Sequence, residues 1–360
     1  MYKVSDKCYF LAMKVFVGMS GGVDSSVTAA QLHKEGHDVA GIFLKGWYPE
    51  NVPCTWKEDR QDAMRVAAHI GIPFTTLDLT KNYKESVIDY LISEYKAGRT
   101  PNPDTLCNRD IKFGAFLDWA KEKGVDKVAT GHYAQVKEEK GIYRLLRGVD
   151  GKKDQSYFLY TLTQNELSHI LFPLGDIKEK SETRKQARAY DLPVAEKRDS
   201  QGLCFIGHVD MEEFLSTHIK TTPGDVLNEK GEIIGAHNGA VIYTLGQRHG
   251  FETRENSEEA LYVLSKDIHK NTITVGPQKS KAKNTPKTLR IENMSWTHVF
   301  PAGNNLTAQY RYHGPEVAVE SITPEGVVTF KENLPEVPAE GQALVLYRGE
   351  ECLGGGTIVY

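Results

Sequence analysis

Residues 18–26 (GMSGGVDSS) constrain the fold of this chain more than any other stretch. They follow the apolar run 15–17 and precede a helical pattern, which predicts a turn from a strand into a helix. Gly21 and Gly22 lack a Cβ, so the backbone can bend sharply and bring its N–H groups close to a ligand. A helix starting near Val23 adds unpaired N–H groups and the positive end of its dipole. The turn is therefore predicted to hold an anion, with Ser20, Ser25 and Ser26 supplying hydroxyls.

Two common nucleotide motifs are missing from this turn. It contains neither G-x-x-x-x-G-K-[ST], the Walker-type loop with its lysine, nor the dinucleotide fingerprint G-x-G-x-x-G. It resembles the SGGxDS loop of the ATP pyrophosphatases, which split ATP between the α and β phosphates and adenylate a carbonyl oxygen. The alternative is an ordinary glycine and serine turn before a helix.

Length and composition indicate a globular protein of two or three domains, with 360 residues, 40% hydrophobic and 26% charged. No run of about 18 apolar residues occurs, so we expect no membrane partner. The net charge of −4 excludes a uniformly basic surface but leaves room for a local basic groove. Residues 1–13 are expected to be a disordered leader or a misassigned start.

The five cysteines, at positions 8, 54, 107, 204 and 352, form no C-x-x-C pair and no zinc spacing. Separate thiols of this kind fit a cytoplasmic protein without a metal site. We take a monomer as the working expectation.

Strands alternate with helices through the first 130 residues, which predicts a doubly wound parallel sheet of the α/β class. Strands are expected near 15–17, 39–44, 74–77 and 127–130, and helices near 23–36, 56–70, 83–97 and 108–123. Ligands of such sheets bind at the carboxyl ends of strands. Ser20, Leu44 and Gly131 follow or end three of these strands and are expected to meet one nucleotide.

Residues 144–207 are predicted to stay largely helical, with two groups of basic residues. The sequence leaves two interpretations of these basic residues: a solvent-exposed helix face, or a surface that contacts a polyanion. The groups are Arg144, Arg147, Lys152 and Lys153, followed by Lys178, Lys180, Arg184, Lys185 and Arg188.

The sequence pattern changes near Pro223, where short strand-like runs separated by Gly and Asn turns begin. We expect a catalytic domain at 14–215, a small β-rich middle domain at 216–278, a polar linker at 279–287, and a C-terminal antiparallel β-barrel at 288–360.

Two cysteines lie in informative stretches. The prolines of 100–108 (TPNPDTLCN) and a helix expected from about Asn108 would place Cys107 at a helix N-terminus, where the dipole lowers a thiol pKa. Cys204 lies in a loop flanked by glycines, 199–207 (DSQGLCFIG), where a substrate could approach. Burial as a small apolar side chain is the alternative for both.

Seven motifs, taken in order, are together similar to the tRNA-specific 2-thiouridylases of bacteria and organelles. They are GMSGGVDSS, TPNPDTLCN, ATGHYA, GKKDQSYFLY, CFIG, YTLGQRHG and CLGGG, and they run from about residue 14 to residue 360. The pyrophosphate loop alone identifies only the superfamily, whereas its combination with both cysteine stretches is highly specific.

The resemblance implies a reaction in two halves. ATP with Mg²⁺ would adenylate the 2-carbonyl oxygen of the wobble uridine in tRNA, and sulfur carried as a persulfide on Cys204 would then replace that oxygen. Cys107 would be the second thiol, which frees sulfide or resolves a disulfide, and Asp104 the general acid/base. The family points to tRNAs for Lys, Glu and Gln, and to a cysteine desulfurase or a sulfur-relay protein as donor.

The resemblance also implies two sets of contact residues. ATP would meet Gly18, Met19, Ser20, Gly21, Gly22, Val23, Asp24, Ser25, Leu44 and Gly131. The tRNA would meet Asn102, Pro103, Asp104, His132, Lys153, Asp154, Gln155, Arg311, Tyr312 and Gln342.

Two other functions stay open from the sequence. An amide-forming ATP pyrophosphatase that uses ammonia would share the loop but would not need Cys107 and Cys204. A non-catalytic tRNA-binding protein with a degenerate nucleotide fold would not need an intact Ser20, Asp24 and Asp104.

Overall fold

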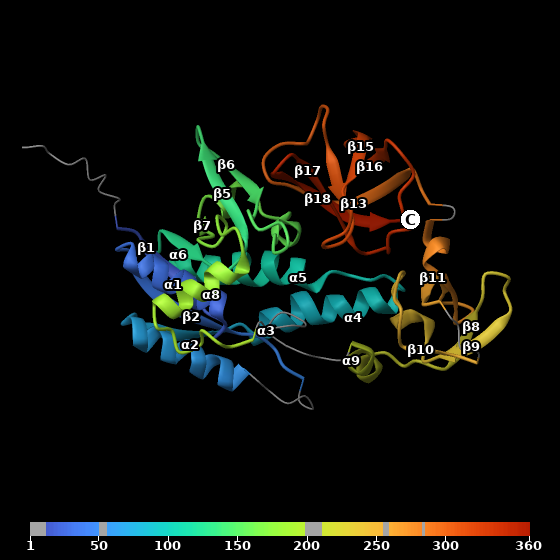
Figure 1. The fold of residues 1–360 in the computed structure, drawn as a ribbon, viewed down its shortest axis with the longest axis horizontal. Helices are drawn as coiled ribbons and strands as arrows, with labels where there is room; N and C mark the ends of the chain where they lie inside the picture. The colour runs from blue at the N-terminus through green and yellow to red at the C-terminus, as the bar shows by residue number, and fades with distance from the viewer. Residues whose placement is uncertain (1–11, 50–55, 199–210, 255–258, 283–284) are drawn as a thin grey trace, which may run out of the picture.

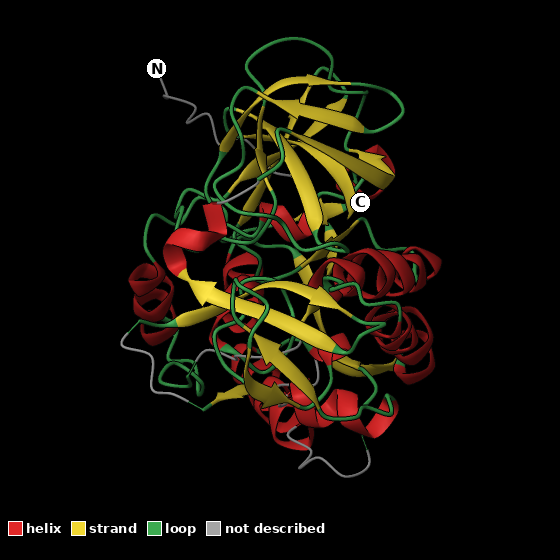
Figure 2. Cartoon of the chain, turned by 90° about the vertical axis from the view of Figure 1, so that its right-hand side faces the viewer, coloured by secondary structure: helices red, strands yellow, loops and turns green. Residues whose placement is uncertain are grey.

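The computed structural model describes residues 12–49, 56–198, 211–254, 259–282 and 285–360. Figure 1 shows an N-terminal α/β part, a β-rich middle part and a C-terminal barrel, and Figure 2 shows the barrel strands above the parallel sheet. This architecture confirms the predicted fold class, while the exact domain boundaries stay a prediction. Among the described residues, no helix is long and apolar enough to cross a membrane.

The N-terminal part is built on a parallel sheet of order β3-β2-β1-β4-β7. Its strands are β1 (Lys14–Gly18), β2 (Asp38–Lys45), β3 (Phe74–Asp78), β4 (Lys127–Ala129) and β7 (Ile170–Leu171). Because β1 pairs with both β2 and β4, the segments that follow these three strands emerge side by side.

Helices cover both faces of this sheet, which explains why the inner residues of β1 and β2 are almost all apolar. Val15 and Val17 of β1 pack in one core with α1 (Val23–Lys34), α2 (Trp56–Ile70) and α8 (Lys180–Ala189). The opposite core receives Phe16 and the helices between β3 and β4. These are α3 (Thr80–Tyr83), π-helix η1 (Lys84–Ile88), α4 (Asp89–Lys96), α5 (Pro103–Leu106), π-helix η2 (Cys107–Ala115) and α6 (Phe116–Glu122).

The expectation of largely helical structure from residue 144 is wrong at its start, since a hairpin stands there. It consists of β5 (Ala134–Glu139) and β6 (Ile142–Arg147), joined at Lys140 and Gly141, which have φ of 55° and 81°. After it come the 3₁₀ turn η3 (Ser156–Leu159), α7 (Gln164–Leu167) and then β7. Strand β6 also pairs with the last strand of the chain, so the hairpin joins the N-terminal part to the barrel.

The middle part is a sheet of order β10-β9-β8-β12-β11, preceded by α9 (Met211–His218). Its strands are β8 (Gly224–Leu227), β9 (Ile233–His237), β10 (Phe251–Thr253), β11 (Leu261–Asp267) and β12 (Thr272–Pro277). Two short 3₁₀ helices accompany them, η4 (Ala240–Ile242) and η5 (Gln278–Ala282), and η5 occupies part of the expected linker.

The C-terminal part is an antiparallel barrel, closed because β13 pairs with both β16 and β18. Its strands are β13 (Thr288–Trp296), β14 (Thr307–Gln309), β15 (Val317–Ile322), β16 (Val327–Phe330), β17 (Ala343–Arg348) and β18 (Glu351–Val359). A core of its own, which includes Leu289, Leu344 and Ile358, fills the barrel.

Candidate active site

The glycine and serine turn after β1 is closed by its own hydroxyls. Ser20 N–H donates to Ser25 Oγ at 3.1 Å, and Ser25 Oγ lies 3.2 Å from the Gly22 carbonyl. Ser26 Oγ donates to the same carbonyl at 2.7 Å. Gly22 is the N-cap of α1 and supplies no side-chain cap, so the first-turn N–H groups of the helix are available to a ligand. The loop therefore presents backbone N–H groups and hydroxyls of the kind that an anion site requires.

Gly21 is required by the shape of this loop. Its φ is +77°, and a Cβ on it would lie 2.1 Å from the Asp59 carbonyl oxygen in the first turn of α2. The loop is thus pressed between α1 and α2, and a side chain at this position would displace one of them.

The other expected nucleotide residues gather around the same turn. Met19 is buried and its N–H donates to the Ile42 carbonyl of β2 at 2.8 Å, two residues before Leu44. Gly131 follows β4, and a Cβ there would lie 2.8 Å from both the carbonyl carbon of Asp24 and the amide nitrogen of Ser25. The structure therefore brings the segments after β1, β2 and β4 together.

Asp24 is the centre of a small polar cluster that the sequence did not reveal. Its carboxylate accepts from the Tyr133 hydroxyl at 2.9 Å and forms an ion pair with Lys180 at the start of α8. The Tyr133 hydroxyl also lies 2.8 Å from Thr183 Oγ1, and Lys180 Nζ lies 5.3 Å from the Tyr133 ring centre. A lysine from a distant helix thus reaches the loop that lacks a Walker-type lysine.

The helix that carries Cys107 begins earlier than expected. Asn102 is its N-cap and accepts from the N–H groups of Asp104 and Thr105, and Pro103 is its first residue. The Cys107 N–H already has the Pro103 carbonyl as an intrahelical partner, and the residue is fully buried. The prediction that Cys107 stands at a helix N-terminus is wrong, since Asp104 occupies the first turn instead.

Cys204 lies outside the described residues, as do Cys8 and Cys54. The chain that leads toward Cys204 is fixed beside the nucleotide loop up to Lys197. Lys197 Nζ donates to Asp59 and Asp62 of α2 at 2.7 Å each, and Arg184 of α8 donates to the Lys197 carbonyl at 2.9 Å.

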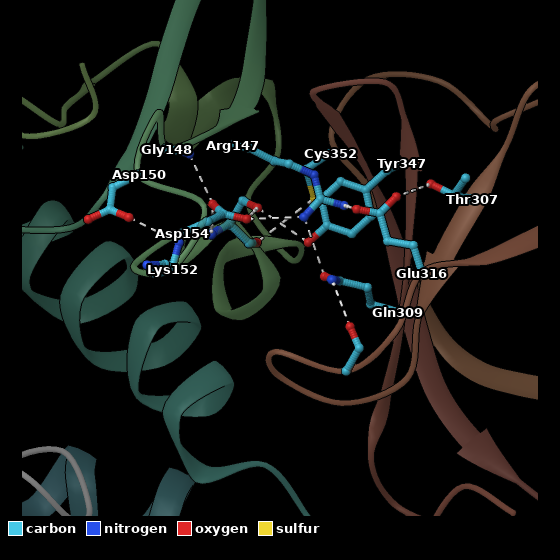
Figure 3. Close-up of polar contacts among 12 residues, drawn as sticks. Arg147, Gly148, Asp150, Lys152, Asp154, Thr307, Gln309, Glu316, Tyr347 and Cys352 are labelled. Carbon is cyan, nitrogen blue, oxygen red and sulfur yellow. Dashed lines mark hydrogen bonds and ion pairs between the residues drawn. The ribbon is translucent and has the colours of Figure 1, made fainter. Parts of the chain in front are cut away.

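Two of the three residues 153–155 turn inward. The buried Asp154 carboxylate accepts from the Gly148 and Ser156 N–H groups at 3.0 Å each and from Arg147 at 3.2 Å. Gln155 Oε1 accepts from the Tyr133 N–H at 3.0 Å. Figure 3 shows Asp154 and Arg147 where the hairpin meets the barrel, beside a cavity of about 710 Å³ that Lys152 and His313 also line. The side chains of Asp154 and Gln155 therefore shape this surface rather than protrude from it.

The barrel contributes an aromatic group close to Asp104. The Tyr312 ring centre lies 4.4 Å from that of Phe158 and 3.8 Å from that of His313, with which it stacks. Burial, and then the negative charges of Asp154, Asp104 and Asp150, raise the pKa of Tyr312 to about 12. A neutral aromatic surface thus stands beside the helix of Cys107.

The remaining expected tRNA contacts have protein partners. Arg311 is exposed and pairs with Glu336 at 3.1 Å. Gln342 Nε2 donates to the Thr100 carbonyl at 2.8 Å, which ties the barrel to the segment before α5. His132 is buried, with Thr130 and Lys112 as neighbours of its two ring nitrogens.

No group of three or more His, Cys, Asp or Glu side chains able to hold a metal ion occurs among the described residues. The Asp24 carboxylate is the acidic group at the loop, and one carboxylate with substrate phosphates is a usual Mg²⁺ environment. The loop fits a metal that arrives with a nucleotide.

The parallel sheet and its phosphate-type loop define a nucleotide-binding α/β protein with a barrel appended. Three family models match successive parts of the chain. They are described as a tRNA methyl transferase HUP domain (residues 13–208), a tRNA methyl transferase PRC-barrel domain (212–277) and an aminomethyltransferase beta-barrel domain (286–358).

Full-length relatives give a more specific result. The tRNA-specific 2-thiouridylases of Lacticaseibacillus paracasei and Enterococcus faecalis are each 45% identical to this chain over 96% of its length, and the alignments cover 94% and 95% of those proteins. The protein of that name from Bacillus subtilis is also 45% identical, over 96% of this chain and 94% of its own. The chain belongs to the tRNA-specific 2-thiouridylase family.

Proposed function

We propose that this protein adenylates the 2-carbonyl oxygen of the wobble uridine of tRNA and then replaces this oxygen with sulfur, giving 2-thiouridine, AMP and pyrophosphate. The observation that carries the proposal is the meeting of the nucleotide loop with the helix of Asp104 and Cys107. Lys112 of that helix contacts His132, which follows Gly131 against the first turn of α1.

The first half of the reaction uses the loop. Residues 18–25 bind the phosphates of ATP through backbone N–H groups and hydroxyls, and Leu44 and Gly131 line the rest of the nucleotide site. Lys180 lies beside Asp24 and adds positive charge where the pyrophosphate leaves. The Asp24 carboxylate, together with the phosphates of ATP, would hold Mg²⁺, which would supply further charge neutralisation.

The second half uses the thiols. The outer sulfur of a Cys204 persulfide attacks carbon 2, and AMP leaves with the former carbonyl oxygen and the electron pair of the broken C–O bond. Cys107, as thiolate, attacks the inner sulfur, so that the S–S electron pair passes to the transferred sulfur and a Cys107–Cys204 disulfide forms. An external thiol reductant then restores both cysteines. Alternatively, Cys107 releases sulfide from the persulfide before the attack on carbon 2, with the same disulfide as product.

Asp104 is suited to the proton transfers because it lies in the first turn of the helix that carries Cys107. In our proposal it accepts the proton that N3 of the uracil loses as the oxygen is adenylated. The wobble base has to leave its stack to reach this site, and Tyr312 with Phe158 offers a stacking surface at the entrance.

For tRNA binding, we assign direct contacts to Lys153, Arg311 and Tyr312. Asn102 and Pro103 shape the turn that presents Asp104, while His132, Asp154, Gln155 and Gln342 act through the protein groups that they hold. We propose tRNAs for Lys, Glu and Gln as substrates and a cysteine desulfurase or a sulfur-relay protein as donor. The enzyme would act as a monomer in the cytoplasm.

The test is tRNA-dependent release of pyrophosphate from ATP, followed by mass spectrometry of the tRNA nucleosides. The unmodified protein should release pyrophosphate and, with a sulfur donor, form 2-thiouridine. Asp24→Ala should abolish the release, whereas Asp38→Ala, at an exposed position at the start of β2, should leave it unchanged. Full pyrophosphate release by Asp24→Ala would show that the loop is misassigned, and amide formation with ammonia would favour a synthetase.

A further inference from the structure

The partly buried Lys112 and the buried His132 form a polar pair to which the reaction steps above assign no chemical role. Lys112 Nζ lies 3.3 Å from His132 Nε2, and His132 Nδ1 lies 2.7 Å from Thr130 Oγ1. The imidazole is only 8% exposed and packs against the rings of Phe113 and Phe172, whose centres lie 5.8 and 5.7 Å away. The ring is therefore held firmly in place.

The protonation state of this pair follows from its surroundings. Burial, and then the positive charge of Lys112, hold the pKa of His132 well below its ordinary value, so the imidazole is neutral at physiological pH. An ammonium can only donate, so Nε2 must be the unprotonated nitrogen and Nδ1 carries the hydrogen toward Thr130. His132 thus presents a fixed acceptor that orients the Lys112 ammonium.

The pair stands between the two halves of the site. On one side, Gly131 packs against Asp24 and Ser25 in the first turn of α1. On the other side, Lys112 belongs to η2, the π-helix that starts at Cys107. Residues five apart are about 140° apart around an α-helix, but the wider i→i+5 winding of a π-helix brings them nearer to one face.

We infer that Lys112 is a catalytic residue of the adenylation step and that its ammonium contacts a non-bridging oxygen of the ATP α-phosphate, with His132 as its positioning residue. The inference rests on the proposed function, because it assigns a group to that reaction. The loop, the α1 N-terminus and Lys180 gather where the pyrophosphate lies, and Asp104 and Cys107 mark the side of the uridine. In this proposal the α-phosphorus lies between these two groups, and the Lys112–His132 pair links them, because His132 follows Gly131 at the loop and Lys112 belongs to the π-helix that starts at Cys107.

In this step the uracil O2 forms a bond to the α-phosphorus, and the bond from that phosphorus to the bridging oxygen breaks. The electron pair of the broken bond leaves on pyrophosphate, and the N3 proton passes to Asp104. Lys112 keeps its protons throughout and stabilises the charge that grows on the phosphoryl oxygens. It complements Lys180, which serves the leaving group.

The experiment compares Lys112→Met, Lys112→Arg and His132→Leu with Lys96→Met, which removes an exposed lysine from α4 of the same domain. Pyrophosphate release is measured with tRNA and ATP, and again with each diastereomer of ATP carrying sulfur on the α-phosphate. The midpoint of thermal unfolding reports whether each variant is folded, and filter binding reports its affinity for tRNA.

Lys112→Met should lower kcat by about 100-fold with little change in the KM for ATP, as expected for a donor that acts in the transition state. It should also lose the preference of the unmodified enzyme for one α-thio diastereomer. Lys112→Arg should restore part of kcat, His132→Leu should lower kcat by about 10-fold, and Lys96→Met should match the unmodified enzyme.

A kcat for Lys112→Met within threefold of the unmodified enzyme, or an unchanged diastereomer preference, would overturn the inference. Loss of tRNA binding by Lys112→Met and Lys112→Arg alike would also overturn it, because the residue would then be structural. An unmodified enzyme that releases no pyrophosphate with tRNA would instead refute the proposed function.

Discussion

Replacing Arg147 with methionine tests how the hairpin holds the barrel. Arg147 lies on β6 and reaches into the barrel, where it pairs with Glu316 at 2.8 Å and stands 3.6 Å from the centre of the Tyr347 ring. On its own side of the junction it pairs with Asp154 at 3.2 Å. Figure 3 shows this one guanidinium between the two parts. Methionine keeps the apolar stem and removes the charge.

The loss of stability expected for Arg147→Met follows from how deeply the ion pair is buried. The Arg147 and Asp154 side chains are 12% and 7% exposed, and removing one partner of a buried ion pair costs about 3–5 kcal/mol. Asp154 keeps hydrogen bonds from Gly148 and Ser156, which lowers the cost, whereas the half-exposed Glu316 adds little. We expect Arg147→Met to destabilise the junction by about 2–3 kcal/mol.

Hydrogen exchange followed by mass spectrometry measures this loss locally. Peptides from β6 and β18 should exchange about 30 to 150 times faster in Arg147→Met, since each 1.36 kcal/mol is a factor of ten. Lys137→Met, at an exposed position of β5 in the same hairpin, is the control and should change exchange little. Equal protection of β6 and β18 in the two variants would refute the assignment of Arg147 as the link.

Three further predictions address the loop, the entrance and acid stability. Gly21→Ala should lose about 1–2 kcal/mol of stability because of its positive φ, and its rate of pyrophosphate release should fall about 100-fold because the added Cβ meets α2. The control is Gly36→Ala, which is also at positive φ but has no atom within 4 Å of its Cβ and should keep full activity. Equal activities of the two variants would show that the loop tolerates a side chain. Tyr312→Ala should weaken tRNA binding by about 1–3 kcal/mol in filter assays, while Tyr312→Phe should bind normally; equal binding by both variants would remove stacking from the interface. The hydrogen bond from Lys45 lowers the pKa of Asp78 from 3.8 to about 2, so the stabilisation that the ionised Asp78 gives is complete above pH 3.8 and is lost as the pH falls toward 2. The urea midpoint of Asp78→Asn should therefore fall less over this pH range than the midpoint of the unmodified chain. Parallel declines of the two midpoints would contradict the assignment.

The first strands and the loop could be predicted because their signals are local. An apolar run, two glycines and a helical pattern stand next to one another, and the parallel sheet places Ser20, Leu44 and Gly131 at neighbouring strand ends without further information. The barrel could be predicted for the same reason, because its strands are separated by clear turn residues.

The β5–β6 hairpin differs from the expected helix, although part of its sequence signal is local. Lys140 and Gly141 form a tight turn, but the basic residues of β6 were interpreted as the face of a helix. The strand also pairs with β18, where Leu145 lies opposite Cys352, and such a long-range partner leaves no trace in local periodicity. Arg147 is charged although it lies in a strand, because it pairs with Glu316 across the junction between the hairpin and the barrel.

The polar groups around the loop depend on contacts between distant segments. In the sequence Lys180 is one of several basic residues, and nothing in its neighbourhood predicts an ion pair with Asp24. The helix start at Pro103, in contrast, had a readable signal in Asn102 as N-cap and proline as first residue. The expected start near Asn108 disregards this signal and therefore places Cys107 at the helix N-terminus.

The most direct test of the account separates its two chemical steps in one protein. Cys204→Ser, incubated with tRNA, ATP and a sulfur donor, should release one pyrophosphate for each activated tRNA and form no 2-thiouridine in nucleoside mass spectrometry. This result would assign activation to the loop and sulfur transfer to the cysteines. Formation of 2-thiouridine by Cys204→Ser at the rate of the unmodified enzyme would contradict the central claim.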